Sequence, residues 1–177
     1  MNIFDRFSLE NKVAIVTGAS SGLGVTFALA LAEAGADVAL GARRVELLEE
    51  TKGKIEALGR RCIAVPTDVS NPMQCEAFVR ATVDRLGDVD VLVNNAGIAQ
   101  VVPPHNEDPA DSNPALTVNL SASYQMAQAF GRACIAPGPG SPLTTISSAL
   151  RLAPPAAPPP PYSTSTPAPL PTTRHPP

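Results

Sequence analysis

Short, largely apolar runs alternate with longer segments of mixed apolar and charged residues over the first half of the chain. The runs lie roughly 25 residues apart and are bounded by glycine or polar residues, a pattern typical of strands buried on both faces of a parallel sheet. The predicted strands are Val13–Val16, Asp37–Gly41, Cys62–Val65 and Asp90–Val93.

The segments between these runs predict helices. The helices expected are Val25–Ala34, which is rich in alanine and leucine, Val45–Leu58, and a third that begins at Asn71-Pro72 and ends near Leu86. Strands that alternate with helices predict an α/β fold of the Rossmann type, with a doubly wound parallel sheet.

The first strand leads into a glycine-rich turn. Gly18, Gly22 and Gly24 have the spacing G-x-x-x-G-x-G rather than the more common G-x-G-x-x-G. Such glycines permit a sharp turn, a close approach to a pyrophosphate and close packing of the next helix, whose N-terminus attracts phosphate. A turn without a ligand is the alternative, but the strand before it and the helix after it favour a dinucleotide site.

Two arginines follow the second predicted strand. Arg43 lies 19 residues after Gly24, near the position where an acidic residue binds the adenosine ribose in NAD sites. A guanidinium there suits a 2′-phosphate, so NADP(H) is favoured and NAD(H) remains possible. Both arginines would otherwise begin the next helix on a solvated face. The ligand interpretation is favoured for Arg43, and both interpretations stay open for Arg44.

Polar and glycine residues follow the strands at their carboxyl ends. Ligands of doubly wound sheets bind outside these ends. We therefore expect one crevice to be lined by the Gly18–Gly24 turn, Arg43, Asp68 and Asn95.

These motifs together resemble the short-chain dehydrogenase/reductase family from about Val13 to Ala136. The glycine motif stands at Thr17–Gly24, the D-V pair at Asp68-Val69 and the N-N-A-G motif at Asn94–Gly97. The resemblance implies hydride transfer between a nicotinamide cofactor and a small carbonyl or alcohol substrate, in a family whose members are usually homo-oligomers. It also implies cofactor contacts at Gly18, Ser20, Ser21, Gly22, Leu23 and Gly24 for the phosphates, Arg43 for the ribose phosphate, Asp68 and Val69 for adenine, and Asn95, Ala96 and Gly97 for the nicotinamide-side ribose.

The catalytic residues implied by the resemblance are Asn119, Ser148 and Tyr162. Family members place a lysine four residues after the tyrosine, on the same helix face, where its charge favours the phenolate. Here that position holds Thr166, which has no charge. Asn119 and Ser148 also have simpler interpretations, as a polar helix residue and a strand-end cap.

Proline dominates the C-terminal segment. The last 41 residues, from Pro137 onward, hold 14 of the 20 prolines, and such density disfavours helices and central strands. We expect a dinucleotide-binding domain over 1–136 and a poorly ordered, degenerate remainder of the catalytic region over 137–177. A short fifth strand is expected at Leu143–Ser147, and the sheet is expected to be C-terminally truncated.

Three interpretations of this segment stay open. The chain is a truncated or corrupted active reductase, a cofactor-binding remnant with little turnover, or a protein whose proline tract is a separate module. A polyproline II segment docks on aromatic grooves, and Pro159–Tyr162 fits the P-P-x-Y pattern of such ligands.

Composition and charge exclude several other classes of protein. The net charge of −3 leaves no basic surface for nucleic acid, and no apolar stretch is long enough to span a membrane. Met1–Lys12 lacks the apolar region of a secretory signal. The three cysteines show no metal or redox spacing, so we expect reduced thiols in a cytoplasmic protein without a metal site.

Overall fold

A computed structural model describes residues 7–99, 105, 112–135 and 144–147 of the chain. Within these residues, five parallel strands form one sheet in the order β3-β2-β1-β4-β5. β1 lies in the centre of the sheet, and all five of its residues, four apolar and Thr17, are buried. The strands are β1 (Val13–Thr17), β2 (Asp37–Ala42), β3 (Cys62–Pro66), β4 (Val91–Asn94) and β5 (Thr144–Ser147).

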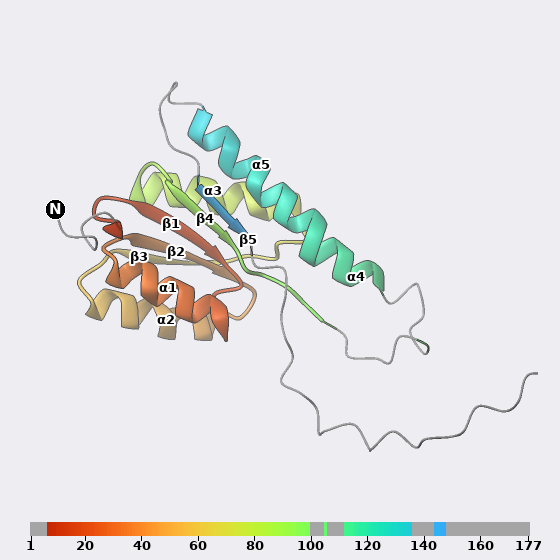
Figure 1. Ribbon diagram of the computed structural model, residues 1–177, viewed down its shortest axis with the longest axis horizontal. Coiled ribbons are helices and arrows are strands. Elements are labelled where there is room, and N and C mark those ends of the chain that lie inside the picture. Colours follow the sequence, from red (N-terminus) through yellow and green to blue (C-terminus); the bar gives the residue numbers. More distant parts are fainter. Residues whose placement is uncertain (1–6, 100–104, 106–111, 136–143, 148–177) are drawn as a thin grey trace, which may run out of the picture.

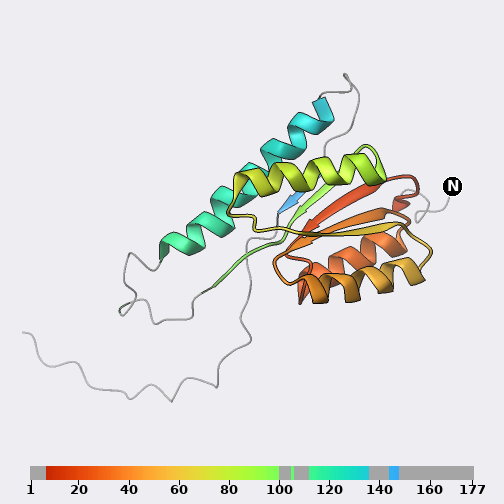
Figure 2. The same ribbon diagram turned by 180° about the vertical axis from the view of Figure 1, so that it is seen from behind.

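Helices cover both faces of the sheet (Figure 1). On one face lie α1 (Leu23–Glu33) and α2 (Val45–Ala57); on the other lie α3 (Pro72–Leu86) and α5 (Ala122–Ile135), which pack against each other (Figure 2). The short helix α4 (Ser112–Leu116) continues into α5 through a π-helical turn, η3 (Thr117–Ser121).

Successive strand residues point to opposite faces, so each strand contributes to two cores. In β1, Ile15 packs with the apolar residues of α3 and α5, whereas Val16 packs with those of α1 and α2. Both side chains are completely buried. The continuous apolar runs in the sequence are the consequence of this two-sided burial.

The predicted doubly wound parallel sheet is confirmed. The predicted strands and helices agree with the observed bounds to within two residues; α1 begins at Leu23 rather than Val25, and β4 begins at Val91 rather than Asp90. The fifth strand is present and pairs with β4. It lies beyond the domain boundary expected at residue 136, and that boundary stays a prediction.

Two carboxylates fix the ends of the strands opposite the glycine-rich turn. Asp37, at the start of β2, accepts hydrogen bonds from the backbone N–H and Nε of Arg61 at 2.9 and 2.8 Å. Asp90 accepts from Lys12 Nζ at 2.8 Å and from the backbone N–H of Val13 at 2.9 Å. These contacts connect the amino ends of neighbouring strands, β2 with β3 and β1 with β4. No helix in the described ranges has the length and apolar character needed to cross a bilayer.

Candidate functional site

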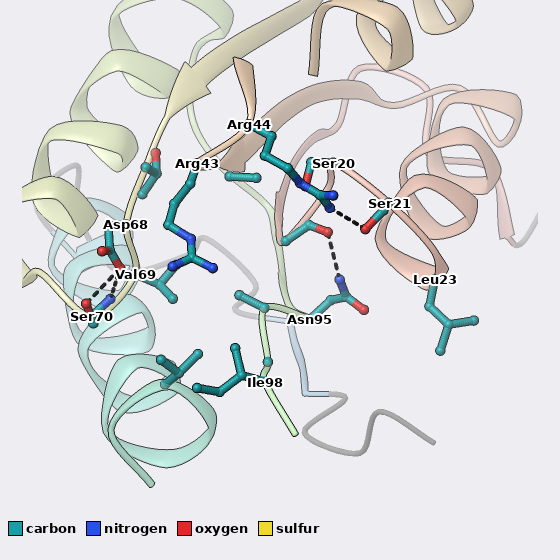
Figure 3. Close-up of a pocket in the computed structure, with 16 residues that line it drawn as sticks. Ser20, Ser21, Leu23, Arg43, Arg44, Asp68, Val69, Ser70, Asn95 and Ile98 are labelled. Atoms are coloured by element: carbon teal, nitrogen blue, oxygen red, sulfur yellow. Dashed lines mark hydrogen bonds between the residues drawn. The ribbon is translucent and has the colours of Figure 1, made fainter. Parts of the chain in front are cut away.

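A cavity of about 500 Å³ opens at the carboxyl ends of the strands. The first turn after β1, the end of β2, the segments after β3 and β4, and the π-helical turn all contribute to its wall (Figure 3). The lining residues are Gly18, Ser20, Ser21, Leu23, Ala42, Arg43, Arg44, Thr67, Asp68, Val69, Ser70, Asn95, Ala96, Gly97, Ile98 and Val118.

The glycine-rich turn has no room for side chains at two of its glycines. Gly18 has a φ of 67°, and a Cβ there would lie 2.7 Å from the Cα of Ala96. A Cβ on Gly24 would overlap the carbonyl of Gly18 and the side chain of Asn95. Gly24 therefore lets α1 begin directly behind the turn. Gly22 precedes the helix with a φ of 61° and brings no side chain to cap it.

Thr17 and Asn95 join the turn to the end of β4. The buried Thr17 hydroxyl accepts hydrogen bonds from the backbone N–H groups of Asn95 and Ala96, both at 3.0 Å, and donates to the carbonyl of Val93. The Asn95 amide in turn donates to the carbonyls of Thr17 and Gly18, at 3.0 and 3.3 Å. The two walls of the cavity are thus held in a fixed relation.

Two exposed arginines at the end of β2 reach into the cavity from the side facing α2. Arg44 contacts the glycine-rich turn: its Nη2 donates to Ser20 Oγ at 3.0 Å and to Ser21 Oγ at 2.6 Å. Arg43 lies across the cavity on the side of Asp68 (Figure 3). The lining therefore carries two cations and, within the described residues, one carboxylate.

Asp68 is held ionised by its own loop. It accepts hydrogen bonds from the hydroxyl and the backbone N–H of Ser70, at 2.7 and 3.0 Å. These bonds, with a smaller contribution from the charge of Arg43, hold the pKa of Asp68 below its usual value. Next to it, the carbonyl of Val69 accepts from the buried thiol of Cys75, so this part of the wall is fixed from behind.

Asn119 binds the segment that follows β4. Its Oδ1 accepts from the backbone N–H of Ile98 at 2.9 Å, and its Nδ2 donates to the carbonyl of Ile98 at 2.8 Å. The side chain thus pairs with the backbone as a neighbouring strand would. Asn119 lies in the π-helical turn and is absent from the cavity wall, although its neighbour Val118 lines it.

The structure brings most of the predicted cofactor residues together on this wall. Gly22 and Gly24 shape the turn without lining the cavity, and Ser148 and Tyr162 lie outside the described residues. Among the lining residues that we did not predict, Ser70 follows Asp68 at the spacing of a local hydrogen-bonded turn, a signal that was available. Val118 and Ile98 gave no such signal: Val118 lies in the π-helical turn, and Ile98 lies in the segment after β4 that Asn119 of that turn binds. The predicted site residues on the wall are Gly18, Ser20, Ser21, Leu23, Arg43, Asp68, Val69, Asn95, Ala96 and Gly97.

These residues fit a dinucleotide. A pyrophosphate and a ribose phosphate require backbone N–H groups and cations. The site offers a tightly packed glycine-rich turn, a helix N-terminus without a side-chain cap and two guanidinium groups. The cavity volume lies within the usual range for small-molecule sites. No group of three histidine, cysteine or acidic side chains in the described part of the chain is arranged to hold a metal ion.

Comparison with known proteins supports the same assignment. Residues 12–168 match the family model for short chain dehydrogenases. The chain belongs to the short-chain dehydrogenase/reductase family. The resemblance noted in the motifs is thereby confirmed, and the match includes the proline-rich segment up to residue 168.

Individual relatives match over part of their length. The chain is 40% identical to an L-rhamnose 1-dehydrogenase (NAD(P)(+)) from Sphingomonas sp. over 79% of the chain and 56% of that enzyme. A short-chain type dehydrogenase/reductase from Mycobacterium marinum is 34% identical with a TM-score of 0.78, covering 83% of this chain and 59% of that one. A short chain dehydrogenase from Burkholderia cenocepacia in complex with NADP is 38% identical with a TM-score of 0.66, covering 70% and 51%. The chain thus spans slightly more than half the length of these relatives.

Proposed function

We propose that this chain binds NADP(H) in preference to NAD(H) at the cavity. The observation that carries the proposal is the pair of arginines at the end of β2, which line the same cavity as the glycine-rich turn. An enzyme selective for NAD places a carboxylate near this position to bind the ribose 2′-hydroxyl, whereas a guanidinium forms paired hydrogen bonds with a 2′-phosphate. One relative is bound to NADP, and the name of another includes both cofactors.

Different residues of the cavity wall bind different parts of the dinucleotide. Gly18, Ser20, Ser21 and Leu23 receive the pyrophosphate at the start of α1, and Arg43 receives the 2′-phosphate. The Asp68 carboxylate, fixed by Ser70, accepts from the adenine amino group, and Val69 packs on the ring. Asn95, Ala96 and Gly97 lie along the nicotinamide-side ribose.

The reaction proposed is that of the family. The bound nicotinamide supplies or accepts a hydride, and the partner is a small carbonyl or alcohol compound. By the family motif, Tyr162 donates or accepts the proton, Ser148 polarises the substrate oxygen, and Asn119 holds a water in the proton path. A free phenol has a pKa of about 10, so Tyr162 needs a neighbouring cation to act near neutral pH.

We further propose that turnover is weak. Thr166 stands where the family motif has lysine, and it supplies no charge to lower the pKa of Tyr162. Pro167, Pro169 and Pro171 come next in the chain, and each interior proline disfavours a helix by roughly 3 kcal/mol. Cofactor binding, which uses residues 18–98, and turnover are therefore expected to separate in this chain.

The test is a fluorescence titration of the purified chain with NADPH and with NADH, with the melting temperature measured in parallel. We expect saturable binding of both, tighter for NADPH, and a rise in melting temperature with ligand concentration. A screen of carbonyl substrates then measures turnover. A chain that melts cooperatively but binds neither dinucleotide contradicts the proposal, and equal affinity for the two contradicts the stated preference.

A further inference from the structure

The loop that carries Asp68 and Val69 is held by the first turn of α3. The Oε1 of Gln74 accepts a hydrogen bond from the backbone N–H of Asp68 at 2.7 Å, and the buried thiol of Cys75 donates to the carbonyl of Val69 at 3.3 Å. Two consecutive helix residues thus bind two consecutive loop residues, both of which line the cavity. The position of this part of the wall therefore depends on α3 as well as on β3, which precedes it.

The contact of Gln74 departs from the usual start of a helix. Asn71 caps α3 by accepting from the backbone N–H of Met73 at 3.0 Å, so Gln74 occupies the third helical position. A glutamine at this position commonly reaches back to the backbone N–H of the cap residue. Here that N–H donates to the carbonyl of Asp68 at 3.0 Å, and Gln74 reaches three residues further along, to the N–H of Asp68. The bond therefore fixes the loop rather than the end of the helix.

The backbone N–H of Asp68 points away from the neighbouring strand. In the described part of the chain, β3 is an edge strand and pairs with β2. The N–H of Thr67 donates to the carbonyl of Ala42, the last residue of β2, at 2.9 Å. Successive N–H groups of an extended chain point to opposite sides, so the N–H of Asp68 faces the open edge. Gln74 supplies the acceptor that another strand would otherwise provide there.

The Asp68 carboxylate keeps one oxygen for a ligand. Among the described residues, the hydrogen bonds to this carboxylate come from the hydroxyl and backbone N–H of Ser70, and both end on Oδ1 (Figure 3). They hold the pKa of Asp68 below its usual value, so the group is ionised and can only accept. Oδ2 therefore suits a purine with an amino group, and it disfavours a purine with a carbonyl oxygen at the same position.

We propose that Gln74 is a positioning residue for purine recognition: by holding the backbone N–H of Asp68, it fixes the direction of the Asp68 carboxylate and so sets the selectivity for adenine over hypoxanthine dinucleotides. The inference rests on the proposed function, which places adenine at Asp68. It adds a residue that lies outside the cavity wall and acts only through Asp68. Cys75 holds the neighbouring Val69 in the same manner.

The test is a fluorescence titration with NADPH and with its hypoxanthine analogue, in which a carbonyl oxygen replaces the adenine amino group. The wild type should bind NADPH about tenfold more tightly, because the analogue loses a hydrogen bond to a charged acceptor. Gln74→Leu removes the acceptor and should lower this ratio about threefold, whereas Gln74→Glu keeps an acceptor oxygen and should retain the ratio. Gln128→Leu, which replaces an exposed glutamine on α5, is the matched control.

The path through Asp68 is tested in a second background. Asp68→Ala should itself remove most of the discrimination between the two ligands. If Gln74 acts through Asp68, adding Gln74→Leu to Asp68→Ala changes the ratio of affinities little further. A further fall as large as the one in the wild-type background contradicts this coupling and overturns the proposed role.

The other outcomes separate a selective role from a structural one. Equal weakening of both ligands in Gln74→Leu, with a lowered melting temperature, shows that the contact only stabilises the loop, and an unchanged ratio shows that it does not direct the carboxylate; each overturns the proposal. A wild type that binds both ligands equally shows that Asp68 does not recognise the amino group, which overturns this inference but leaves dinucleotide binding in place. A folded wild-type chain that binds neither contradicts the proposed function itself, and the role of Gln74 with it.

Discussion

The Phe78 ring fills the space that a side chain on Gly41 would occupy. Gly41 lies in β2 near its carboxyl end, and a Cβ there would overlap the ring edge, with the Phe78 Cζ only 2.8 Å away. Phe78 on α3 is completely buried, in the core that α3 and α5 form with this face of the sheet. The close approach of α3 to β2 thus depends on a glycine two residues before Arg43.

Enlarging Gly41 is expected to destabilise the fold. Gly41→Ala should lower the free energy of unfolding by about 1–3 kcal/mol, because the ring must leave its packed position. In a Phe78→Leu background the same substitution should cost less, since the overlap is relieved. Gly53→Ala is the control: nothing lies within 4 Å of a Cβ there, and alanine in an exposed helix should stabilise the chain. Urea unfolding measures all four, and an additive double variant would contradict the clash.

The Thr17 hydroxyl is expected to be necessary for the junction between β1 and β4. Thr17→Val keeps the shape but removes the acceptor used by the N–H groups of Asn95 and Ala96, and should lower the free energy of unfolding by about 2 kcal/mol or more. Thr17→Ser keeps the hydroxyl and should lose less than half of this. Equal losses in the two variants would assign the effect to the lost methyl packing instead.

The strands and most helices were predictable because their cause is local. All of β1 is buried, and its first four residues, Val13–Val16, are apolar.

Asn71 before Pro72 has the composition of a helix start, and its side chain accepts from the backbone N–H of Met73. The start of α1 was placed two residues late. Its first turn begins inside the glycine-rich motif, where Leu23 carries no amphipathic signal and is exposed.

Arg43→Asp is expected to shift the cofactor preference towards NADH. The aspartate repels the 2′-phosphate and can accept from the ribose 2′-hydroxyl, so the ratio of NADPH to NADH affinity should fall about tenfold or more. Arg43→Gln separates the two effects, since it removes the cation without adding a carboxylate near Asp68. Titration with both cofactors gives the ratio, and Arg80→Asp controls for the change in net charge. An unchanged ratio of NADPH to NADH affinity would show that Arg43 does not contact the 2′-phosphate.

Buried thiols are expected to make stability fall at high pH. Burial raises the pKa of the Cys62 thiol from about 9 to about 12 and that of Cys75 to about 11. The pKa values of both thiols are higher in the folded chain than in the unfolded chain. The folded chain therefore keeps its full stability below about pH 9. It loses part of this stability as the pH rises towards 11–12, because the thiols of the unfolded chain ionise first.

The measurement is the free energy of unfolding between about pH 8 and about pH 10.5 in the wild type and in Cys62→Ala and Cys75→Ala. Each variant should start less stable, because a small cavity forms, but should show a shallower decline with pH. The comparison of slopes cancels the titration of groups that all three proteins share. Parallel slopes would show that the thiols ionise equally in the folded and unfolded chain.

Restoring the motif lysine alone is expected to leave turnover low. Thr166→Lys supplies the missing charge, but the prolines after it still disfavour the helix that would hold it four residues from Tyr162. Oxidation of NADPH with a panel of carbonyl substrates measures this. Tyr162→Phe in the same background is the control for any activity that remains. A large gain in turnover from Thr166→Lys, abolished by Tyr162→Phe, would contradict the expectation.

The site residues could be predicted only where a polar or charged side chain directly follows a strand. Arg43, Asp68 and Asn95 follow strands directly, so the sheet alone brings them together. The pairing of Asn119 with Ile98 joins residues 21 apart through both the N–H and the carbonyl of one residue. Nothing local in the sequence marks such a contact, because it arises when the helix α4–α5 packs beside the end of β4.

The π-helical turn lets one helix serve two neighbours. A π turn holds an additional residue compared with an α turn, which rotates the rest of the helix by about 100°, one residue's share of a helical turn. Beyond the turn, Ala122, Met126 and Phe130 face the core at α-helical spacing; within it, Val118 lines the cavity and Asn119 reaches Ile98. Removing one residue here would turn one half of the helix out of phase with its partners. The fold therefore depends on the length of this turn more than on the identity of its exposed residues.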